Sequence, residues 1–420
     1  MDQIVDRTEI QKAPQDTSRC MVPLGEALAL IGRMREAFFA ALPAEPIAAE
    51  AAVGRVLAEA AVSRANMPAY DTCTMDGYAV RAADLADRGA VRHPLRIVGE
   101  AYAGQGFRQI GPGEAVYVTT GARLPAGSDA VLQVEHARVD GDRLSGVPLE
   151  PGKFVVPAGA DLRAGETLLK AGTLVAPAAA GVLLAGRVER VVVYRKPRVA
   201  VIATGDEVVD GTIADANGPM ACALLEAWGC APSRMAPVGD NRDDIAAAID
   251  AALRDHDVVL TIGGVSMGRK DFSSAAAAGG ELVFKGVRVK PGKPFIASYL
   301  RGKPVFALPG KPSGSYTAME LFLRRFLLGE DRRPAVSVPV SHDVRPTAPG
   351  FDNVVFVELC GGRAMPMGYA GSSVSLLASP EYETSLLSTS PRTVLADGYF
   401  IFRDPVKAGQ PVDVRLSGSP

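Results

Sequence analysis

The sequence has few of the residues from which disulfide frameworks and metal clusters are built. Its 420 residues include five cysteines and four histidines, and no two cysteines form a Cys-x-x-Cys pair. Structural zinc sites and disulfide scaffolds need closely spaced cysteines or histidines. We therefore expect neither of them, and we do not expect catalysis by a cysteine–histidine pair.

Long apolar runs and an excess of one charge are also absent. The longest uncharged apolar stretch, residues 172–186, contains Pro177, and it is shorter than the ~20 residues that a membrane-spanning helix needs. Residues 1–7 are polar and acidic, unlike the start of a signal peptide. With 45 basic and 47 acidic residues, the chain has no broad basic excess for nucleic acid. We expect a cytoplasmic protein that binds neither membranes nor nucleic acid.

The residue composition and the hydrophobic pattern change along the chain, which predicts several domains. A helix is expected over residues 24–42, where apolar residues recur at three- and four-residue steps before Pro43. Residues 1–20 resemble a loose tail. Short β-branched runs between glycine and proline turns follow, and helical character returns over residues 162–187. We assign one linking domain to 19–60 and 155–194, a β-rich insertion domain to 61–154, an α/β domain to 195–334 and a C-terminal β-domain to 335–420.

The α/β segment has the pattern of a doubly wound fold. An apolar run at 198–204 begins an alternation of buried strands with helical segments around 217–229 and 242–255. Continuous apolar strands that alternate with helices indicate βαβ units on a parallel sheet. In the last domain, strands are expected around 336–338, 354–357 and 399–402.

A strand that ends in glycines provides the first indication of a ligand site. The apolar run after Asp257 ends in Gly263 and Gly264. Glycines let the backbone approach a ligand closely and direct amide groups at it. A tight turn without a ligand is the alternative interpretation.

Two lysine–proline–glycine turns follow that strand. An extended, polyproline-like path through Pro291 would put Lys290 and Lys293 on the same side, where two ammonium groups suit a dianion. Residues 308–312 repeat the pattern, and a helix expected over 316–328 would direct its N-terminus at the same pocket. The sequence thus predicts a site for phosphate or another oxyanion, although lysines in such loops are often only solvated.

Carboxylates accompany this predicted oxyanion site. Glu207 follows the strand at 198–204, Asp240 precedes a helical segment, and Asp271 lies five residues after Ser266. A carboxylate beside an oxyanion needs a cation or a role in proton transfer, which suggests Mg²⁺ or catalysis. The plainer alternatives are a solvated turn at Glu207 and an N-terminal helix cap at Asp240.

Two stretches of the β-rich segment carry polar groups without a clear pattern. Residues 70–80 contain Asp71, Cys73 and Asp76, but they lack the polarity pattern of a buried strand, so we interpret them as a turn. Residues 119–122 offer hydroxyl groups and a glycine after a strand, which is ambiguous by itself.

Taken together, the motifs resemble those of the MoeA family, the molybdopterin molybdenumtransferases, which includes the E domain of gephyrin. The resemblance covers nearly the whole chain. It is carried by Met75-Asp76-Gly77-Tyr78-Ala79, Thr120-Gly121-Ala122, Thr204-Gly205-Asp206-Glu207, Gly263-Gly264-Val265-Ser266, Lys290-Pro291-Gly292-Lys293-Pro294 and Leu308-Pro309-Gly310.

This resemblance implies a multidomain α/β homodimer, with a MogA-like molybdopterin-binding domain at 195–334 and a cleft completed by the partner's β-rich domain. The family takes adenylylated molybdopterin, hydrolyses the adenylate with Mg²⁺ and inserts molybdate into the dithiolene. Molybdopterin adenylyltransferase and molybdoenzyme apoproteins are the implied partners. Tungstate is an alternative to molybdate.

The resemblance also implies site residues, at the positions of this sequence that match the family's motifs. Those matching catalytic residues are Asp71, Thr120, Glu207, Asp240, Asp271, Lys290 and Lys293, the first two approaching from the partner subunit. Glu207, Asp240 and Asp271 are assigned to the metal and to pterin or adenylate, and the lysines to molybdate and phosphate. Cofactor contacts are implied for Thr204, Gly205, Gly263, Gly264, Ser266, Pro309, Gly310, Lys311 and Ser315.

The chain also departs from the family pattern. Where members usually read Pro-Gly-Asn-Pro-Val-Ser, this chain has Lys311 at the asparagine and Gly314 at the serine, unless Ser315 takes its place. Residues 350–356 lack the arginines common there. An insertase is the leading interpretation. The alternatives are a molybdopterin-binding paralog that carries or scaffolds the cofactor, and an unrelated phosphate-binding α/β protein.

Overall fold

The computed structural model describes residues 20–86, 93–107, 109–264, 280–329, 333, 335–346, 350–369, 371–374, 387 and 389–417. The chain divides into two compact units. Unit 1 comprises Met1–Glu45, Gly54–Val56 and Tyr194–Pro420, and unit 2 comprises Pro46–Val53 and Leu57–Val193. Each unit is described by itself. The division into four domains, which was based on composition and hydrophobic pattern, stays a prediction.

Unit 1 is built on a seven-stranded mixed sheet. β20, β16, β14 and β15 run parallel, as predicted for a doubly wound domain, whereas β19 is antiparallel to both β17 and β20. The N-terminal tail was predicted to extend to residue 20, but a strand begins there and pairs in parallel with β17. The spatial order is β1 (Cys20–Val22), β17 (Gly280–Val287), β19 (Ile296–Leu300), β20 (Lys303–Leu308), β16 (Val258–Ile262), β14 (Arg198–Ala203) and β15 (Ala231–Arg234).

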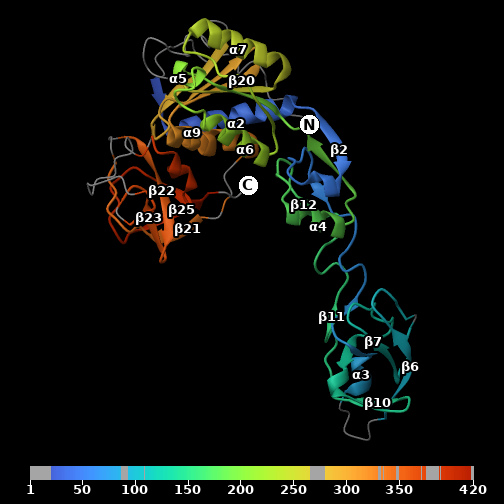
Figure 1. Ribbon diagram of the computed structural model, residues 1–420. Coiled ribbons are helices and arrows are strands. Elements are labelled where there is room, and N and C mark those ends of the chain that lie inside the picture. Colours follow the sequence, from blue (N-terminus) through green and yellow to red (C-terminus); the bar gives the residue numbers. More distant parts are fainter. Residues whose placement is uncertain are drawn as a thin grey trace. The chain divides into compact units, whose positions relative to one another are not determined.

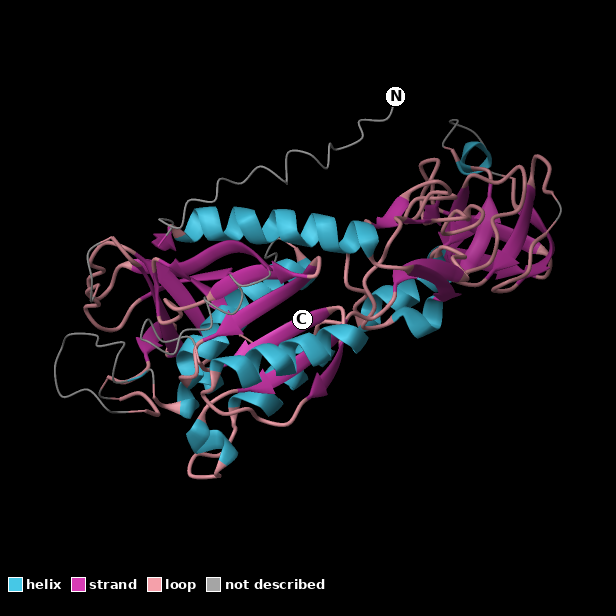
Figure 2. Ribbon diagram, turned by 90° about the horizontal axis from the view of Figure 1, so that it is seen from above, coloured by secondary structure: helices cyan, strands magenta, loops and turns pink. Residues whose placement is uncertain are grey.

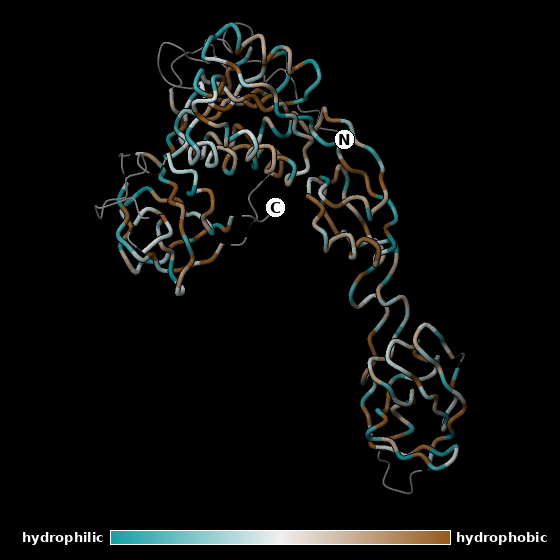
Figure 3. The backbone as a smooth tube through the Cα atoms, viewed as in Figure 1, coloured by the Kyte–Doolittle hydropathy of each residue, from teal (hydrophilic) through white to brown (hydrophobic). Residues whose placement is uncertain are grey.

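Helices cover both faces of this sheet (Figure 1). Val199 and Val201 of β14 join a core with α2 (Leu24–Ala41) and α6 (Asn217–Ala227). The intervening residues of β14 join a second core with α7 (Arg242–Asp255). Successive side chains of a strand point to opposite faces, so a strand buried on both faces is apolar throughout. Apolar colour accordingly concentrates in the strands of this sheet (Figure 3).

A helical run from Pro312 links the sheet to the C-terminal part of unit 1. It consists of α9 (Pro312–Ala318), a π-helical segment (Met319–Leu323) and α10 (Arg324–Leu328). The helix was predicted to begin at residue 316, but it begins earlier because proline is compatible with the first turn. Glu320 is buried and forms an ion pair with buried Arg333. Arg333 also donates to the Tyr399 hydroxyl at 3.0 Å.

The C-terminal part of unit 1 is a second sheet, and its strands confirm the three strand-like runs. Lys290 of β18 (Val289–Lys290) pairs in parallel with Asn353, so this sheet also anchors one of the predicted lysines. The other strands are β22 (Asp352–Cys360), β24 (Gly398–Phe402), β25 (Pro411–Leu416), β21 (Ala335–Pro339) and β23 (Arg363–Pro366).

Unit 2 contains a six-stranded sheet. The interpretation of residues 70–80 as a turn was wrong, since Thr72–Cys73 forms the short strand β4 and Gly77–Val80 forms β5 between β7 and β8. The glycine is required there because a Cβ at Gly77 would lie 2.2 Å from the Leu132 carbonyl oxygen. The order is β8 (Ala130–Gln133), β5, β7 (Glu114–Val118), β6 (Leu95–Ala101), β10 (Arg143–Gly146) and β9 (Ala137–Asp140).

The rest of unit 2 has less helix than predicted for residues 162–187. Only α4 (Pro177–Ala185) is helical there, and Thr167–Leu169 forms a strand. The helices and strands of both units are distinguished by colour in Figure 2. The remaining elements here are β2 (Ala44–Ala48), β3 (Ala61–Val62), β4 (Thr72–Cys73), β11 (Val155–Val156), β12 (Thr167–Leu169), β13 (Arg190–Tyr194), α3 (Ala82–Leu85) and short 3₁₀ turns at Ala49–Ala52 and Val134–His136. Unit 1 also contains the short helix α5 (Asp206–Val209) and a 3₁₀ turn at Pro391–Leu395.

Among the helices that the structure describes, none is both long enough and apolar enough to span a membrane.

Candidate active site

The carboxyl ends of three parallel strands meet at one edge of the unit 1 sheet. Ala203 ends β14 opposite Ile262, and Ile262 ends β16 opposite Leu308. Ligands of open α/β sheets bind at this edge, and a cavity of about 900 Å³ lies here. Of the predicted site residues, its lining includes Thr204, Glu207, Asp240, Gly263, Gly264, Lys290, Lys293, Pro309, Gly310 and Lys311.

Glycines allow the loops at this edge to pack closely. A Cβ at Gly263 would lie 2.5 Å from the Thr204 carbonyl oxygen, and one at Gly310 would lie 3.3 Å from the Gly263 Cα. One of the two predicted amide donors, that of Gly263, is used within the protein, as is the amide of Gly205. Gly263 N–H donates to Leu308 O at 3.0 Å, and Gly205 N–H donates to Val238 O at 3.0 Å. Gly205 and Gly263 therefore bring the loops together and do not supply free donors.

Two of the three predicted metal carboxylates line the cavity. The Glu207 carboxylate lies close to the backbone of Gly205, since a Cβ at Gly205 would be 2.7 Å from Glu207 Oε1. Asp240 comes from the loop before α7, and its backbone N–H donates to Asp206 Oδ1 at 3.0 Å. The alternative of Asp240 as a helix cap was wrong: the cap is Asn241, whose side chain accepts from the N–H groups of the first turn.

The third carboxylate, Asp271, lies outside the described residues, as does Ser266. Within the part of the chain that is described, no group of three histidine, cysteine or carboxylate side chains is arranged to hold a metal.

Lys290 and Lys293 line the same cavity, but not through a polyproline path. Residues 291–294 form a turn, with Gly292 at a φ of 113°. This glycine packs against α9, since a Cβ there would lie 3.3 Å from Thr317 Cγ2. Lys290 Nζ lies 5.4 Å from the centre of the Phe351 ring, within reach of a cation–π contact. An aromatic side chain from the segment that lacks arginines thus contacts a predicted catalytic lysine.

Sequence reasoning missed several lining residues. Asn217, the first residue of α6, donates from Nδ2 to Gly310 O at 2.7 Å and so supports the loop that carries Lys311. Asp215 also lines the cavity, as do Thr389 and Pro391 from the C-terminal part of unit 1. An amide side chain beside a glycine-rich loop offered some signal at Asn217. Nothing local could have found Thr389 and Pro391.

Ser315 is fully buried, and its hydroxyl has no hydrogen-bond partner among the residues that the structure describes. The cavity lining contains its neighbour Gly314 but not Ser315. The expectation that Ser315 takes the position of the family's serine hydroxyl at the cavity is therefore not supported by this lining.

The remaining predicted residues, Asp71 and Thr120, belong to unit 2. Asp71 Oδ1 accepts from Ala158 N–H at 2.8 Å. Thr120 donates to Asp76 Oδ1 from its backbone N–H at 2.7 Å and from its hydroxyl at 3.0 Å. These two donors hold the pKa of Asp76 below its ordinary value. Asp71 and Thr120 are both exposed, and each is fixed by local hydrogen bonds.

The fold and this edge of the sheet define a class of proteins. They are doubly wound α/β proteins that bind an anionic ligand where parallel strands end, and here lysines and carboxylates share one cavity.

Comparisons with known proteins specify the family. The MoeA N-terminal region (domain I and II) matches residues 22–186, and a probable molybdopterin binding domain matches residues 200–329. A molybdopterin molybdenumtransferase of Staphylococcus aureus is 31% identical over 315 residues, which is 72% of this chain and 74% of that protein. One from a Nostoc species is 35% identical over 278 residues, covering 63% of this chain and 64% of that protein.

A solved structure of a molybdopterin biosynthesis MoeA protein from Pyrococcus horikoshii is 30% identical, with a TM-score of 0.71. The match covers 95% of this chain and all of that one. The chain belongs to the MoeA family.

Proposed function

We propose that this protein inserts molybdate into adenylylated molybdopterin with release of AMP. The observation that carries the proposal is the cavity at the carboxyl edge of the sheet, where three lysines, Lys290, Lys293 and Lys311, lie with three carboxylates, Glu207, Asp215 and Asp240. It falls within the segment that matches a probable molybdopterin binding domain. The non-catalytic paralog is less favoured, because the similar curated proteins are molybdopterin molybdenumtransferases.

The charges in the cavity suit the reactants. Molybdate and the phosphates of the adenylate are anions, and lysine side chains attract them strongly where water is partly excluded. In the proposed reaction, water cleaves the phosphoanhydride and AMP leaves. The two dithiolene thiols then form two molybdenum–sulfur bonds in place of two molybdenum–oxygen bonds, and the two oxygens leave as water with the thiol protons and two protons from solvent.

Mg²⁺ fits the donor set that the described residues supply. Protein sites often hold Mg²⁺ through one or two carboxylates together with substrate phosphates, and Glu207 and Asp240 line one cavity. Mg²⁺ would neutralise charge on the phosphates of the adenylate. In our proposal, these two carboxylates hold the ion, Asp271 adds to them, and Lys290 with Lys293 binds the anions.

We further propose a cytoplasmic homodimer in which Asp71 and Thr120 complete the partner subunit's cleft. The exposed surface of helix α4 favours the proposal of a homodimer. Val182 and Leu184 are apolar and exposed on it, and a helix that is apolar on every side is normally covered. Molybdopterin adenylyltransferase would supply the substrate, and molybdoenzyme apoproteins would receive the product.

The direct test incubates the full chain with adenylylated molybdopterin, Mg²⁺ and molybdate. AMP is measured by chromatography, and active cofactor is measured by reconstitution of a molybdenum-dependent apoenzyme. AMP release together with active cofactor supports the insertase. Binding without turnover supports the paralog, and absence of binding contradicts both.

A further inference from the structure

We propose that Asp206 is a positioning residue that holds the Asp240 loop beside Glu207, so that the two carboxylates can bind one divalent cation. The inference rests on the proposed function. It concerns a side chain to which the resemblance gave no role.

The contact itself is specific. Asp206 Oδ1 accepts the backbone N–H of Asp240 at 3.0 Å. Gly239, the residue before Asp240, leaves room for this contact, since a Cβ at position 239 would lie 2.7 Å from Asp206 Oδ1. A side chain at position 239 would therefore displace the Asp206 carboxylate.

The rest of the loop is fixed on both sides of Asp240. On one side, Val238 pairs with Thr204, accepting from Gly205 N–H and donating to Ala203 O, each at 3.0 Å. On the other side, Asn241 caps α7, accepting from Asp243 N–H at 2.8 Å. Between these anchors, the backbone N–H of Asp240 is held by its hydrogen bond to Asp206.

The position of Asp206 indicates support rather than ligation. Glu207 and Asp240 belong to the cavity lining, whereas Asp206 does not. Asp206 and Glu207 are adjacent on the short helix α5, so one element holds one carboxylate directly and the other through a hydrogen bond. Groups that orient metal ligands in this way usually change metal affinity by about 10–100-fold when they are removed.

The role requires an acceptor oxygen, not a charge, which allows a sharp test. Asp206→Ala removes the acceptor, whereas Asp206→Asn keeps a carbonyl oxygen in its place. Gly239→Ala should displace the carboxylate without removing it. Asp210→Ala is the matched control, because Asp210 terminates the same helix but accepts from Thr212 N–H in its own turn at 2.8 Å.

The primary readout is binding of Mn²⁺ alone to the full chain, followed by electron paramagnetic resonance. We expect Asp206→Ala and Gly239→Ala to weaken Mn²⁺ binding by roughly tenfold or more, with Asp206→Asn and Asp210→Ala within about twofold of the unsubstituted chain. The Mg²⁺ concentration for half-maximal AMP release should rise by the same factor in the first two variants. Thermal unfolding of each variant identifies any that fail to fold.

Each adverse outcome has a distinct meaning. Unchanged Mn²⁺ binding in folded Asp206→Ala overturns the inference. Equal losses in Asp206→Ala and Asp206→Asn overturn it as well, because the charge would then matter rather than the acceptor. Absence of Mn²⁺ binding by the unsubstituted chain also overturns it. Mn²⁺ binding without AMP release by that chain contradicts the proposed function and leaves the inference to be decided by the Mn²⁺ measurements.

Discussion

The two units hold their candidate site residues in different ways. In unit 1, residues at the ends of β14 and β16, from the loop after β20 and from the C-terminal part of the unit line one cavity, although they lie far apart in sequence. In unit 2, Asp71 and Thr120 are exposed and fixed by hydrogen bonds to Ala158 and Asp76. The first arrangement depends on sheet topology and on packing between loops. The second depends on a few local contacts, so substitutions should affect the two units differently.

The largest effect is expected from breaking the buried ion pair of unit 1. Glu320→Ala leaves Arg333 buried without its carboxylate, and an uncompensated buried charge costs about 3–5 kcal/mol. Denaturant unfolding should show a destabilised unit 1 transition and an unchanged unit 2 transition. The double variant Glu320→Leu/Arg333→Met should recover most of the loss. A double variant as unstable as Glu320→Ala would contradict this account.

A smaller effect, on molybdate binding, is expected when a lysine of the unit 1 cavity is removed. Removal of a lysine in unit 2 should not change this binding. Lys293→Ala removes a charge from the cavity, and hydrogen bonds to charged groups contribute about 1.5–3 kcal/mol. Molybdate binding, measured by calorimetry, should therefore weaken by roughly 10–100-fold. Lys170→Ala, an exposed lysine of unit 2, is the control and should bind like the unsubstituted chain. Undiminished binding by Lys293→Ala would remove the lysine from the proposed site.

A glycine substitution tests how tightly unit 2 is packed. Gly77→Ala places a Cβ 2.2 Å from the Leu132 carbonyl oxygen, and forcing extra atoms into a packed core costs about 1–3 kcal/mol. Unit 2 should lose that stability in thermal unfolding, and Thr120 should lose its fixed position because β5 follows Asp76 directly. Gly181→Ala is the matched control. It meets no atom within 4 Å and should stabilise α4 by up to ~1 kcal/mol.

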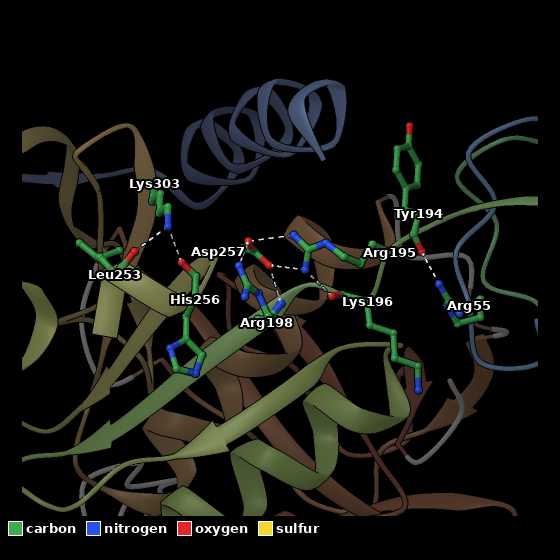
Figure 4. A network of polar contacts seen from close by, with 9 residues as sticks. All are labelled: Arg55, Tyr194, Arg195, Lys196, Arg198, Leu253, His256, Asp257 and Lys303. Atoms are coloured by element: carbon green, nitrogen blue, oxygen red, sulfur yellow. Dashed lines mark hydrogen bonds and ion pairs between the residues drawn. The ribbon is translucent and has the colours of Figure 1, made fainter. Parts of the chain in front are cut away.

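The smallest effect concerns the opposite edge of the unit 1 sheet, where Asp257 accepts two hydrogen bonds from Arg195 and one from Arg198 N–H (Figure 4). Burial by itself would raise the pKa of Asp257, but these donors outweigh it, and the pKa lies below its ordinary value of 3.8.

A lowered folded-state pKa contributes stability that is fully present above pH 3.8. It is lost as pH falls from there through the folded-state value. We expect a change of about 1 kcal/mol or less. Urea unfolding between pH 5 and 2 should show a shallower acid dependence in Asp257→Asn. An identical pH dependence in the variant would exclude this contribution.

Several elements of both units could be predicted from local patterns. The helix from residue 24 and the strands around 198–204 were predicted correctly, because continuous or periodic apolar residues have few alternatives once a core forms. The segment at 70–80 was misread, since Gly77 breaks the pattern for a reason that lies on the neighbouring strand. The polyproline path of Lys290 and Lys293 was wrong because a turn packs against α9 instead. In residues 162–187, Pro177 and Gly186 bound α4 and could have predicted that the helix is confined there.

The sequence by itself determined the family, the doubly wound class and the lysines and carboxylates that we propose for an anion site, because these depend on residue types and short spacings. The tertiary structure decided which of them share a cavity. It brought Thr389 and Pro391 to that cavity, excluded Ser315 from its lining and placed Asp206 under the Asp240 loop. Such contacts join residues distant in sequence, and they arise only when parallel strands end at the same edge and glycines let their loops pack together.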